Sequence, residues 1–363
     1  MNDATAPRTS IVRAPGRVNV IGGQIDFHEG IVIAAALDLD VVCTYSARDD
    51  GLVTLRSEGF DGELRVAADG SVEPSEVEPD WARNAAGLVR TLAVRGRPAR
   101  GVDVAATSTV PAGAGLSSSA ALDCALGLAL ADVASWTIDR RDLAHACMEA
   151  EHIGSGFRCG IMDPITSLFG SADHLLMIDC RDLSIRTLPL PSSVRLALVH
   201  TGVARRLDMT PYNDRRAAAL AIAPRLGLRA LRDASLDQVA EEPLGQHVVN
   251  EIERVRAFGA ALDLGGVEAL GPLMLASHAS SRDFVGVSIP ELDALVDALV
   301  SAGALGARLT GGGFGGCVVA LVPTDRAAEV VGTAVAAYTE CTGLQPLVSF
   351  VARPAAGAGP VPG

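Results

Sequence analysis

The sequence predicts an α+β fold divided into two halves of similar size. Short apolar, β-branched stretches alternate along the chain with longer segments whose apolar residues recur at helical spacing. Strands and helices are therefore mixed from end to end. Pro189 and Pro191 interrupt the pattern near the middle of the 363 residues. We place the boundary there and predict an N-terminal domain over 10–188 and a C-terminal domain over 189–353.

Each predicted element depends on a local pattern. Trp81, Leu88 and Leu92 lie seven and then four residues apart, which predicts a helix over 81–95. Residues 101–109 alternate between apolar and polar and end before a proline, which is typical of a strand. Further strands are predicted at 31–36, 40–46, 52–56, 174–179, 195–200, 316–322 and 346–352. Further helices are predicted at about 118–133, 141–152, 213–225, 245–262 and 290–302.

The composition excludes several classes of protein. Hydrophobic residues make up 49% and charged residues 20%, which indicates a globular chain. The formal net charge of -13 opposes a nucleic-acid partner. All 30 basic residues are arginine, so the lysines of the usual P-loop and of protein kinases are missing. If this chain binds a nucleotide, other groups must hold the phosphates.

The termini and the cysteines predict the compartment. The seven cysteines are scattered and form no CxxC pair, which favours reduced thiols over a zinc site or a disulfide framework. The N-terminus lacks the apolar core of a signal peptide, and no apolar run reaches the ~18 residues of a membrane span. We expect a soluble, cytoplasmic monomer or weak homodimer with no membrane partner. Residues 1–9 are predicted to be a loose arm and 354–363 a disordered tail.

A glycine- and serine-rich segment between a predicted strand and a predicted helix is the strongest local signal. It reads Pro111-Ala-Gly-Ala-Gly-Leu-Ser-Ser-Ser-Ala-Ala-Leu122. Gly113 and Gly115 permit tight turns and a close approach of the backbone to a ligand. The serines fall in the first turn of the helix, where unpaired N–H groups and the helix dipole attract anions. The segment predicts a phosphate site; the alternative is an N-capped helix after an ordinary turn.

Three further segments carry candidate functional residues. Leu309–Cys317 has five glycines in six positions, which indicates a backbone loop close to a ligand or a tight crossing of strands. Asp26 follows a strand-like run and a double glycine, and is either a ligand contact or a turn residue. Asp163, in the segment Cys159–Pro164, is a candidate general base or a helix cap, with Glu151 upstream on a predicted helix.

Together and in this order, these segments resemble the galactokinase branch of the GHMP kinase superfamily over about residues 11–352. Pro111–Leu122 resembles the family's phosphate loop, and Cys159–Asp163 resembles the galactokinase catalytic-aspartate segment. The other resembling segments are 306–317 (glycine-rich motif), 210–216 (sugar-contacting tyrosine) and 81–84 (tryptophan near adenine). The resemblance implies two α+β lobes with the active site in the cleft between them. It also implies ATP-dependent phosphorylation of the anomeric-type hydroxyl of a monosaccharide or a sugar-like cyclitol.

The resemblance further implies a role for each matching residue. Asp163 would be the general base for the substrate hydroxyl, and Arg17 would stabilise the transferring phosphoryl group and keep Asp163 ionised. Ser119 and Glu151 would hold the Mg²⁺ that bridges the ATP phosphates. The ATP-binding residues would be Pro111, Gly113, Ala114, Gly115, Leu116, Ser117, Ser118, Ser119 and Trp81. The substrate-binding residues would be Gly23, Gln24, Asp26, Arg158, Tyr212, Gly312 and Gly313.

The chain departs from the galactokinase pattern where that family contacts the sugar. Galactokinases usually read Gly-Glu-His-Thr-Asp-Tyr where this chain reads Gly22-Gly-Gln-Ile-Asp-Phe27. Gly23 replaces the acid that contacts the exocyclic hydroxyl, and Gln24 replaces the histidine. Arg158 and Pro164 replace an asparagine and a glutamine beside the aspartate motif. Since a pocket that loses hydrogen-bonding groups loses discrimination, strict galactokinase activity is not expected.

Two kinds of substrate account for Gly23. A pentose, as in plant arabinokinases, has no exocyclic group. A heptose or C7-cyclitol already phosphorylated at position 7 gains from the lost carboxylate, which at about 4 Å would cost roughly 4 kcal/mol at an effective dielectric of ~20; Arg158 would supply a charge-assisted partner. The 7-phosphate 1-kinase is the main prediction, and a galactokinase or arabinokinase acting on the free sugar is the alternative.

Two points stay open. A non-catalytic regulator that binds sugar and ATP is a second alternative, although the complete catalytic set argues against it. Either Gln24 or His28 is a candidate to replace the missing sugar contacts.

Overall fold

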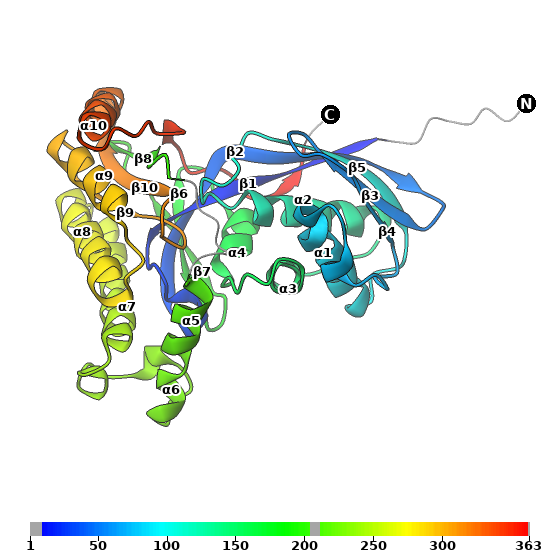
Figure 1. Ribbon diagram of the computed structural model, residues 1–363, viewed down its shortest axis with the longest axis horizontal. Helices are drawn as coiled ribbons and strands as arrows, with labels where there is room; N and C mark the ends of the chain where they lie inside the picture. Colours follow the sequence, from blue (N-terminus) through cyan, green and yellow to red (C-terminus); the bar gives the residue numbers. More distant parts are fainter. Residues whose placement is uncertain (1–8, 204–210, 362–363) are drawn as a thin grey trace, which may run out of the picture.

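The computed structural model describes residues 9–203 and 211–361, and its elements form two β-sheets with helices packed against them (Figure 1). The larger sheet has the strand order β12-β1-β2-β5-β3-β4, and β2 also pairs with β6, which pairs with β7. All pairs are antiparallel except β3 with β5. Its strands are β1 Ser10–Ile21, β2 Ile31–Arg48, β3 Leu52–Ser57, β4 Leu64–Ala67, β5 Gly101–Ser108, β6 His174–Asp179, β7 Ile185–Pro189 and β12 Gly359–Pro360.

Four helices cover one face of this sheet, as Figure 1 shows below the blue and cyan strands. The inner pair, α2 and α4, contacts β1 and β2 directly, and α1 and α3 pack against each other beside them. Alanine, leucine and cysteine side chains fill the interface, because α2 is apolar on nearly every face. The helices are α1 Arg83–Val94, α2 Ser118–Val133, α3 Arg140–Gly154 and α4 Met162–Phe169.

The second sheet has the order β11-β8-β10-β9, and its strands β8, β10 and β9 are buried on both faces. Along β8, Leu196 and Leu198 belong to the large core, whereas Ala197 and Val199 belong to a separate core under α9 and α10. This is the period of two that a strand imposes. The elements are β8 Val194–His200, β9 Gly306–Leu309, β10 Cys317–Pro323, β11 Ser349–Ala352, α9 Pro290–Ser301 and α10 Ala327–Thr342.

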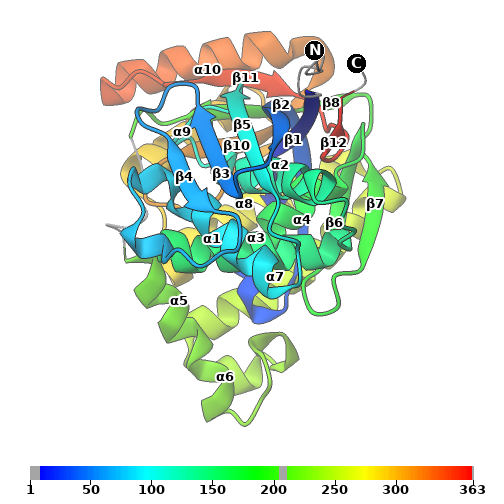
Figure 2. The ribbon, with the colours of Figure 1, turned by 90° about the vertical axis from the view of Figure 1, so that its right-hand side faces the viewer.

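The remaining helices lie beside the two sheets. Helix α7, Pro243–Asp263, contacts β2, β7 and α8, Leu270–Ser280. Helices α5, Tyr212–Leu220, and α6, Ile222–Arg225, extend beyond the rest of the molecule (Figure 2). Among the described helices, none is both long and apolar enough to cross a bilayer. All seven cysteines are free thiols, as predicted.

Most predicted elements are present, with two kinds of difference. The predicted strands 31–36 and 40–46 form one continuous strand, β2. Residue 210, the first of the tyrosine segment, lies outside the described residues, as do residues 1–8 of the predicted arm. The following helices and strands were not predicted: α4, α8, α10, β4, β7, β9 and β12.

The prediction of a disordered tail is wrong for residues 354–361, which pack along the larger sheet. Pro354 bridges to Leu37, and Gly359 and Pro360 pair with β1. The amides of Gly357 and Ala358 donate to the carbonyl oxygens of Gly170 and Ser167, at 2.7 and 2.8 Å. The tail therefore closes the C-terminal end of α4, the helix that carries Asp163. Main-chain hydrogen bonds of this kind need no apolar pattern, so composition does not reveal them.

Removing residues 354–363 is expected to lower the free energy of unfolding by about 2–5 kcal/mol, because several main-chain hydrogen bonds are lost at roughly 1 kcal/mol each. Urea denaturation of the full and truncated chains measures the difference. An unfolding free energy unchanged to within about 0.5 kcal/mol would show that the tail contributes nothing to stability.

Candidate active site

A cavity of about 580 Å³ opens where the two sheets meet the N-terminal ends of α2, α4 and α5. Its size is in the range of small-molecule sites. Strand β1 has a register shift between Pro15 and Arg17, and bulges often occur beside functional sites. The residues predicted to be functional that line it are Arg17, Gly23, Gln24, Asp26, Trp81, Gly113, Gly115, Ser117, Ser118, Ser119, Glu151, Asp163, Tyr212 and Gly312.

An arginine–aspartate pair forms the centre of the cavity wall. Nε and Nη2 of Arg17, on β1, donate to the two carboxylate oxygens of Asp163 at 2.6 and 2.5 Å. Nη1 of Arg17 donates to the carbonyl oxygen of Gly115 at 2.8 Å. The Arg17 side chain is 5% exposed and that of Asp163 17%, so the pair is held rigidly while the carboxylate stays accessible. Such a two-pronged pair fixes the plane of the carboxylate.

Asp163 lies in the first turn of α4 and has a third partner. The hydroxyl of Ser117 donates to Oδ2 of Asp163. A carboxylate offers about four lone-pair positions. Three donors therefore leave room for one more, and an incoming hydroxyl group can occupy it from the cavity.

The glycine- and serine-rich loop ends at the N-terminus of α2, as predicted. Gly113 and Gly115 have φ values of 71° and 79°, and Ser117 has a left-handed φ of 58° before the helix begins at Ser118. The first turn of a helix has N–H groups without intrahelical partners. Since Ser117, Ser118 and Ser119 line the cavity, this turn presents its N–H groups and partial positive charge to it.

Oxygen donors suited to a hard divalent cation lie beside this turn. The hydroxyl of Ser119 and the carboxylate of Glu151 both line the cavity. Asp123, one turn further along α2, is buried, and burial together with the charge of Glu151 raises its pKa well above the usual range. Mg²⁺ commonly binds through one or two such protein oxygens, completed by phosphate and water. The residues present therefore fit a magnesium ion shared with a bound phosphate chain.

Asp26 lies at the start of a short 3-10 helix, Asp26–His28, and faces the same cavity. A Cβ at position 160 would lie 1.8 Å from Oδ2 of Asp26, so only glycine at Gly160 lets this carboxylate sit there. Burial and then the charge of Asp163 raise the pKa of Asp26 to about 6. Burial and the neighbouring Asp26 also raise the pKa of Tyr212, so its phenol remains a hydrogen-bond donor.

The structure gives a reason for glycine at position 23 that the sequence does not reveal. A Cβ at this position would lie 2.2 Å from Nη2 of Arg308, whose side chain is fully buried in β9. Nη1 of Arg308 donates to Oδ1 of Asn19 at 2.5 Å. Glu251, on α7, accepts from the amides of Gly22 and Gly23 at 2.9 and 3.3 Å. Gly23 lines the cavity, but the space that a side chain at this position would enter is taken by an arginine from the other sheet.

The structure distinguishes between Gln24 and His28 as the residue that could replace the missing sugar contacts. Gln24 lines the cavity, and its Nε2 donates to the carbonyl oxygen of Gly311 at 3.2 Å. His28 is 1% exposed and is not among the residues that line this cavity. Burial and the nearby His247 lower the pKa of His28 to about 3, so it is neutral. Gln24 is therefore the side chain available to a ligand.

Five residues predicted to contact ligands do not line the cavity. Arg158 is exposed on the surface, which removes the partner expected for a substrate phosphate. A Cβ at Gly313 would lie 2.3 Å from the carbonyl oxygen of Val287, so this glycine packs away from the cavity. The others are Pro111, Ala114 and Leu116. Ala114 and Leu116 are buried, and the carbonyl oxygen of Leu116 accepts from the amide of Arg17 at 3.0 Å, so they shape the loop.

Comparison with known proteins gives matches over nearly the whole chain. Residues 82–171 match the GHMP kinases N terminal domain, 259–340 match GHMP kinases C terminal, and 3–47 match the galactokinase galactose-binding signature. A galactokinase of Chloroflexus aggregans is 42% identical over 94% of this chain and 92% of its own length. One of Streptomyces coelicolor is 40% identical over 95% of this chain and 92% of its own length.

A solved structure agrees with these matches. The crystal structure of Lactococcus lactis galactokinase complexed with galactose has a TM-score of 0.91 at 28% identity, covering 98% of this chain and 95% of that one. The predicted two-lobed α+β fold is confirmed. The main prediction of an already phosphorylated substrate is not supported: the relatives are galactokinases, Arg308 occupies the space at Gly23, and Arg158 is outside the cavity lining. The free-sugar alternative fits better.

Proposed function

The chain belongs to the galactokinase branch of the GHMP kinases, and we propose that it transfers the γ-phosphoryl group of ATP to the anomeric hydroxyl of galactose. The observation that carries this proposal is the Arg17–Asp163 pair beside the N-terminus of α2, since it joins a carboxylate base to an anion site in one cavity. The galactose-binding signature over 3–47 and the galactose-bound relative support galactose as the sugar.

In this proposal Asp163 accepts the proton of the sugar hydroxyl as that oxygen attacks the γ-phosphorus. Its remaining lone-pair position takes the hydroxyl's hydrogen bond, and its rigid plane orients the attacking oxygen. Arg17 lies between Asp163 and the phosphate loop and stabilises the negative charge of the transferring group.

The phosphates of ATP would lie against the loop that ends at Ser119, where N–H groups of the first turn of α2 donate to them. This arrangement replaces the lysine that the sequence lacks. Ser119 and Glu151 would hold Mg²⁺, which when bound neutralises charge on the phosphate oxygens. Trp81 lines the same cavity, and its indole ring would offer an apolar surface for the base of the nucleotide.

Asp26, Gln24 and Tyr212 would bind the hydroxyl groups of the sugar. An ionised Asp26 can accept hydrogen bonds from two hydroxyls, and the Tyr212 phenol can donate one. Gln24 offers its amide oxygen, because its Nε2 is used by Gly311. The ring of Tyr212 packs on Phe157 at 4.7 Å between centroids, which fixes its position.

The pH dependence of kcat/KM for galactose should follow the ionisation of the Asp26 carboxyl group. Its pKa of about 6 in the free protein means that the accepting form is lost as the pH falls through about 6. We expect kcat/KM for galactose to decrease below that pH, since this parameter reports groups of the free enzyme. The Asp26→Asn variant should be weak at every pH and lack this decrease. If the variant keeps the same acidic limb, another group is responsible.

A panel assay tests the proposed function. ADP release is measured with galactose, arabinose, a heptose 7-phosphate and a 7-phosphorylated cyclitol at equal concentrations. The proposal predicts the highest kcat/KM for galactose. A higher value for a phosphorylated substrate would contradict the proposed sugar, and binding of galactose and ATP without turnover would indicate a regulator.

A further inference from the structure

Glu29 ends the short helix that begins with Asp26, and its conformation is unusual. Its φ is 58°, in the left-handed region that few non-glycine residues adopt. The next residue, Gly30, leads directly into β2. Only two residues separate Glu29 from Asp26, and the short helix joins them. Contacts that fix Glu29 therefore also restrict the carboxylate that faces the cavity.

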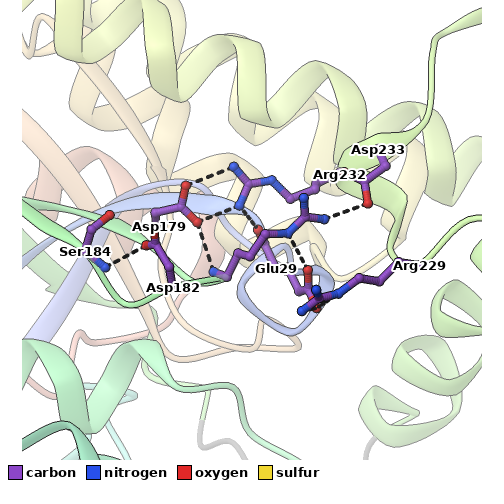
Figure 3. A network of polar contacts seen from close by, with 8 residues as sticks. Glu29, Asp179, Asp182, Ser184, Arg229, Arg232 and Asp233 are labelled. Carbon is purple, nitrogen blue, oxygen red and sulfur yellow. Dashed lines mark hydrogen bonds and ion pairs between the residues drawn. The ribbon is translucent and has the colours of Figure 1, made fainter.

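Three arginines hold Glu29, and Figure 3 shows two of them, Arg229 and Arg232, beside it. Arg181 donates from Nε to Oε2 of Glu29 at 2.5 Å, and Arg229 donates from Nε to Oε1 at 2.9 Å. Arg232 donates from Nη1 to the carbonyl oxygen of Glu29 at 2.7 Å. The contact from Arg232 thus holds the main chain of Glu29, a residue in a strained conformation. Ordinary surface ion pairs join side chains only.

The same arginines join two distant parts of the chain. Arg232 makes a two-pronged contact with Asp179, at the end of β6, at 2.5 and 2.9 Å. Arg181 donates to Asp233 at 2.6 Å. The Arg232 side chain is 12% exposed, so solvent screens this contact less than it screens a surface pair. We call this set the Glu29 network: Glu29, Asp179, Arg181, Arg229, Arg232 and Asp233.

The network connects through α6 and α5 to Tyr212, another residue that lines the cavity. Residues 229–233 follow α6, and α5 begins with Tyr212, which lines the cavity. A second contact ties α5 to the same loop, because the Arg216 guanidinium lies 5.0 Å from the ring centre of Phe27. Two sets of contacts therefore join the segment with Asp26 to the α5–α6 segment that begins with Tyr212. Arg216 of α5 contacts Phe27, and Arg229 and Arg232, which follow α6, contact Glu29.

We propose that the Glu29 network is a positioning device that sets Asp26 and Tyr212 at the separation needed to bind the sugar. The inference rests on the proposed function, because it assigns both residues to the sugar. Partial burial would raise the pKa of Glu29, but hydrogen bonds from Arg181 and Arg229 outweigh it and lower that pKa. The network is thus fully charged at neutral pH, and salt is the variable that weakens it.

The test is the Glu29→Gln variant, which keeps the size of the side chain and removes its charge. We expect KM for galactose to rise by about three- to tenfold, the size of one or two lost charge-assisted contacts. KM for ATP and kcat should stay within about twofold, because the phosphate loop and Asp163 are untouched. About 1 M NaCl should raise KM for galactose in the wild-type protein but hardly further in Glu29→Gln.

The matched control is Glu329→Gln, at the start of α10, which removes one exposed ion pair with Arg326 away from the cavity. This variant should change neither the KM for galactose nor the KM for ATP. Equal changes of both KM values in Glu29→Gln, or an unchanged KM for galactose, would overturn the inference.

A second measurement does not depend on the sugar. Hydrogen–deuterium exchange of the free protein should be faster at residues 24–30 and 212–220 in Glu29→Gln than in the wild type. Unchanged exchange there would overturn the positioning role. If the wild-type protein neither binds nor phosphorylates galactose, the proposed function fails, and exchange alone decides whether the network fixes the two segments.

Discussion

Replacing Asp163 with asparagine is expected to lower kcat for galactose by about 10²–10⁴-fold, the usual contribution of a positioned general base. Asparagine has the same shape but cannot accept the proton of the sugar hydroxyl. Its NH₂ group would also face the N–H groups of Arg17, so that one of the two hydrogen bonds from Arg17 would be lost. Initial rates of ADP release at saturating galactose and ATP measure the effect.

The chain offers a matched control for this variant. Asp40 also pairs with an arginine of β1, since Nη1 of Arg13 lies 2.7 Å from its Oδ1, but neither residue lines the cavity. Asp40→Asn should keep kcat within about twofold. A kcat for Asp163→Asn within tenfold of the wild type would remove Asp163 from the role of base.

Replacing Arg17 with glutamine should lower kcat by about 10³-fold or more, the range seen for arginines that stabilise a transferring phosphoryl group. The change removes charge from the cavity and also releases Asp163 and the carbonyl oxygen of Gly115. Single-turnover rates separate this loss from weaker ATP binding.

Arg13→Gln is the control for this second variant, because it lies on the same strand and loses a similar ion pair outside the cavity. Its kcat should match that of the wild type. If both arginine variants lose activity equally, the loss reflects damage to β1 and not to the chemistry.

Local patterns predict local structure well in this chain. Helix α2 begins and ends at the residues predicted for it, and the glycine- and serine-rich loop lies at its N-terminus. Two missed helices show the limit. In α10 the buried residues Val330, Ala334 and Tyr338 do lie at helical spacing, so the signal was present. In α8 the buried face contains glycine, serine and histidine, which no apolar pattern reveals.

Most features of the site that the sequence does not predict are contacts between residues far apart in the chain. Arg17 and Asp163 are 146 positions apart, and only the resemblance to a known family joined them. Nothing near Gly23 indicates that Arg308 fills the adjacent space, or that Glu251 holds the glycine amides. Such partners depend on how the two sheets pack, so one sequence without its fold cannot identify them. As a result, the same glycine led to the prediction of an already phosphorylated substrate, which the galactokinase relatives do not support.

The most direct test of the central claim is a crystal structure of the protein with galactose, Mg²⁺ and a non-hydrolysable ATP analogue. The account predicts the anomeric hydroxyl about 2.6–3.2 Å from the Asp163 carboxylate, with the phosphate chain against the first turn of α2. A different hydroxyl beside Asp163, or phosphates bound away from Ser117–Ser119, would contradict it.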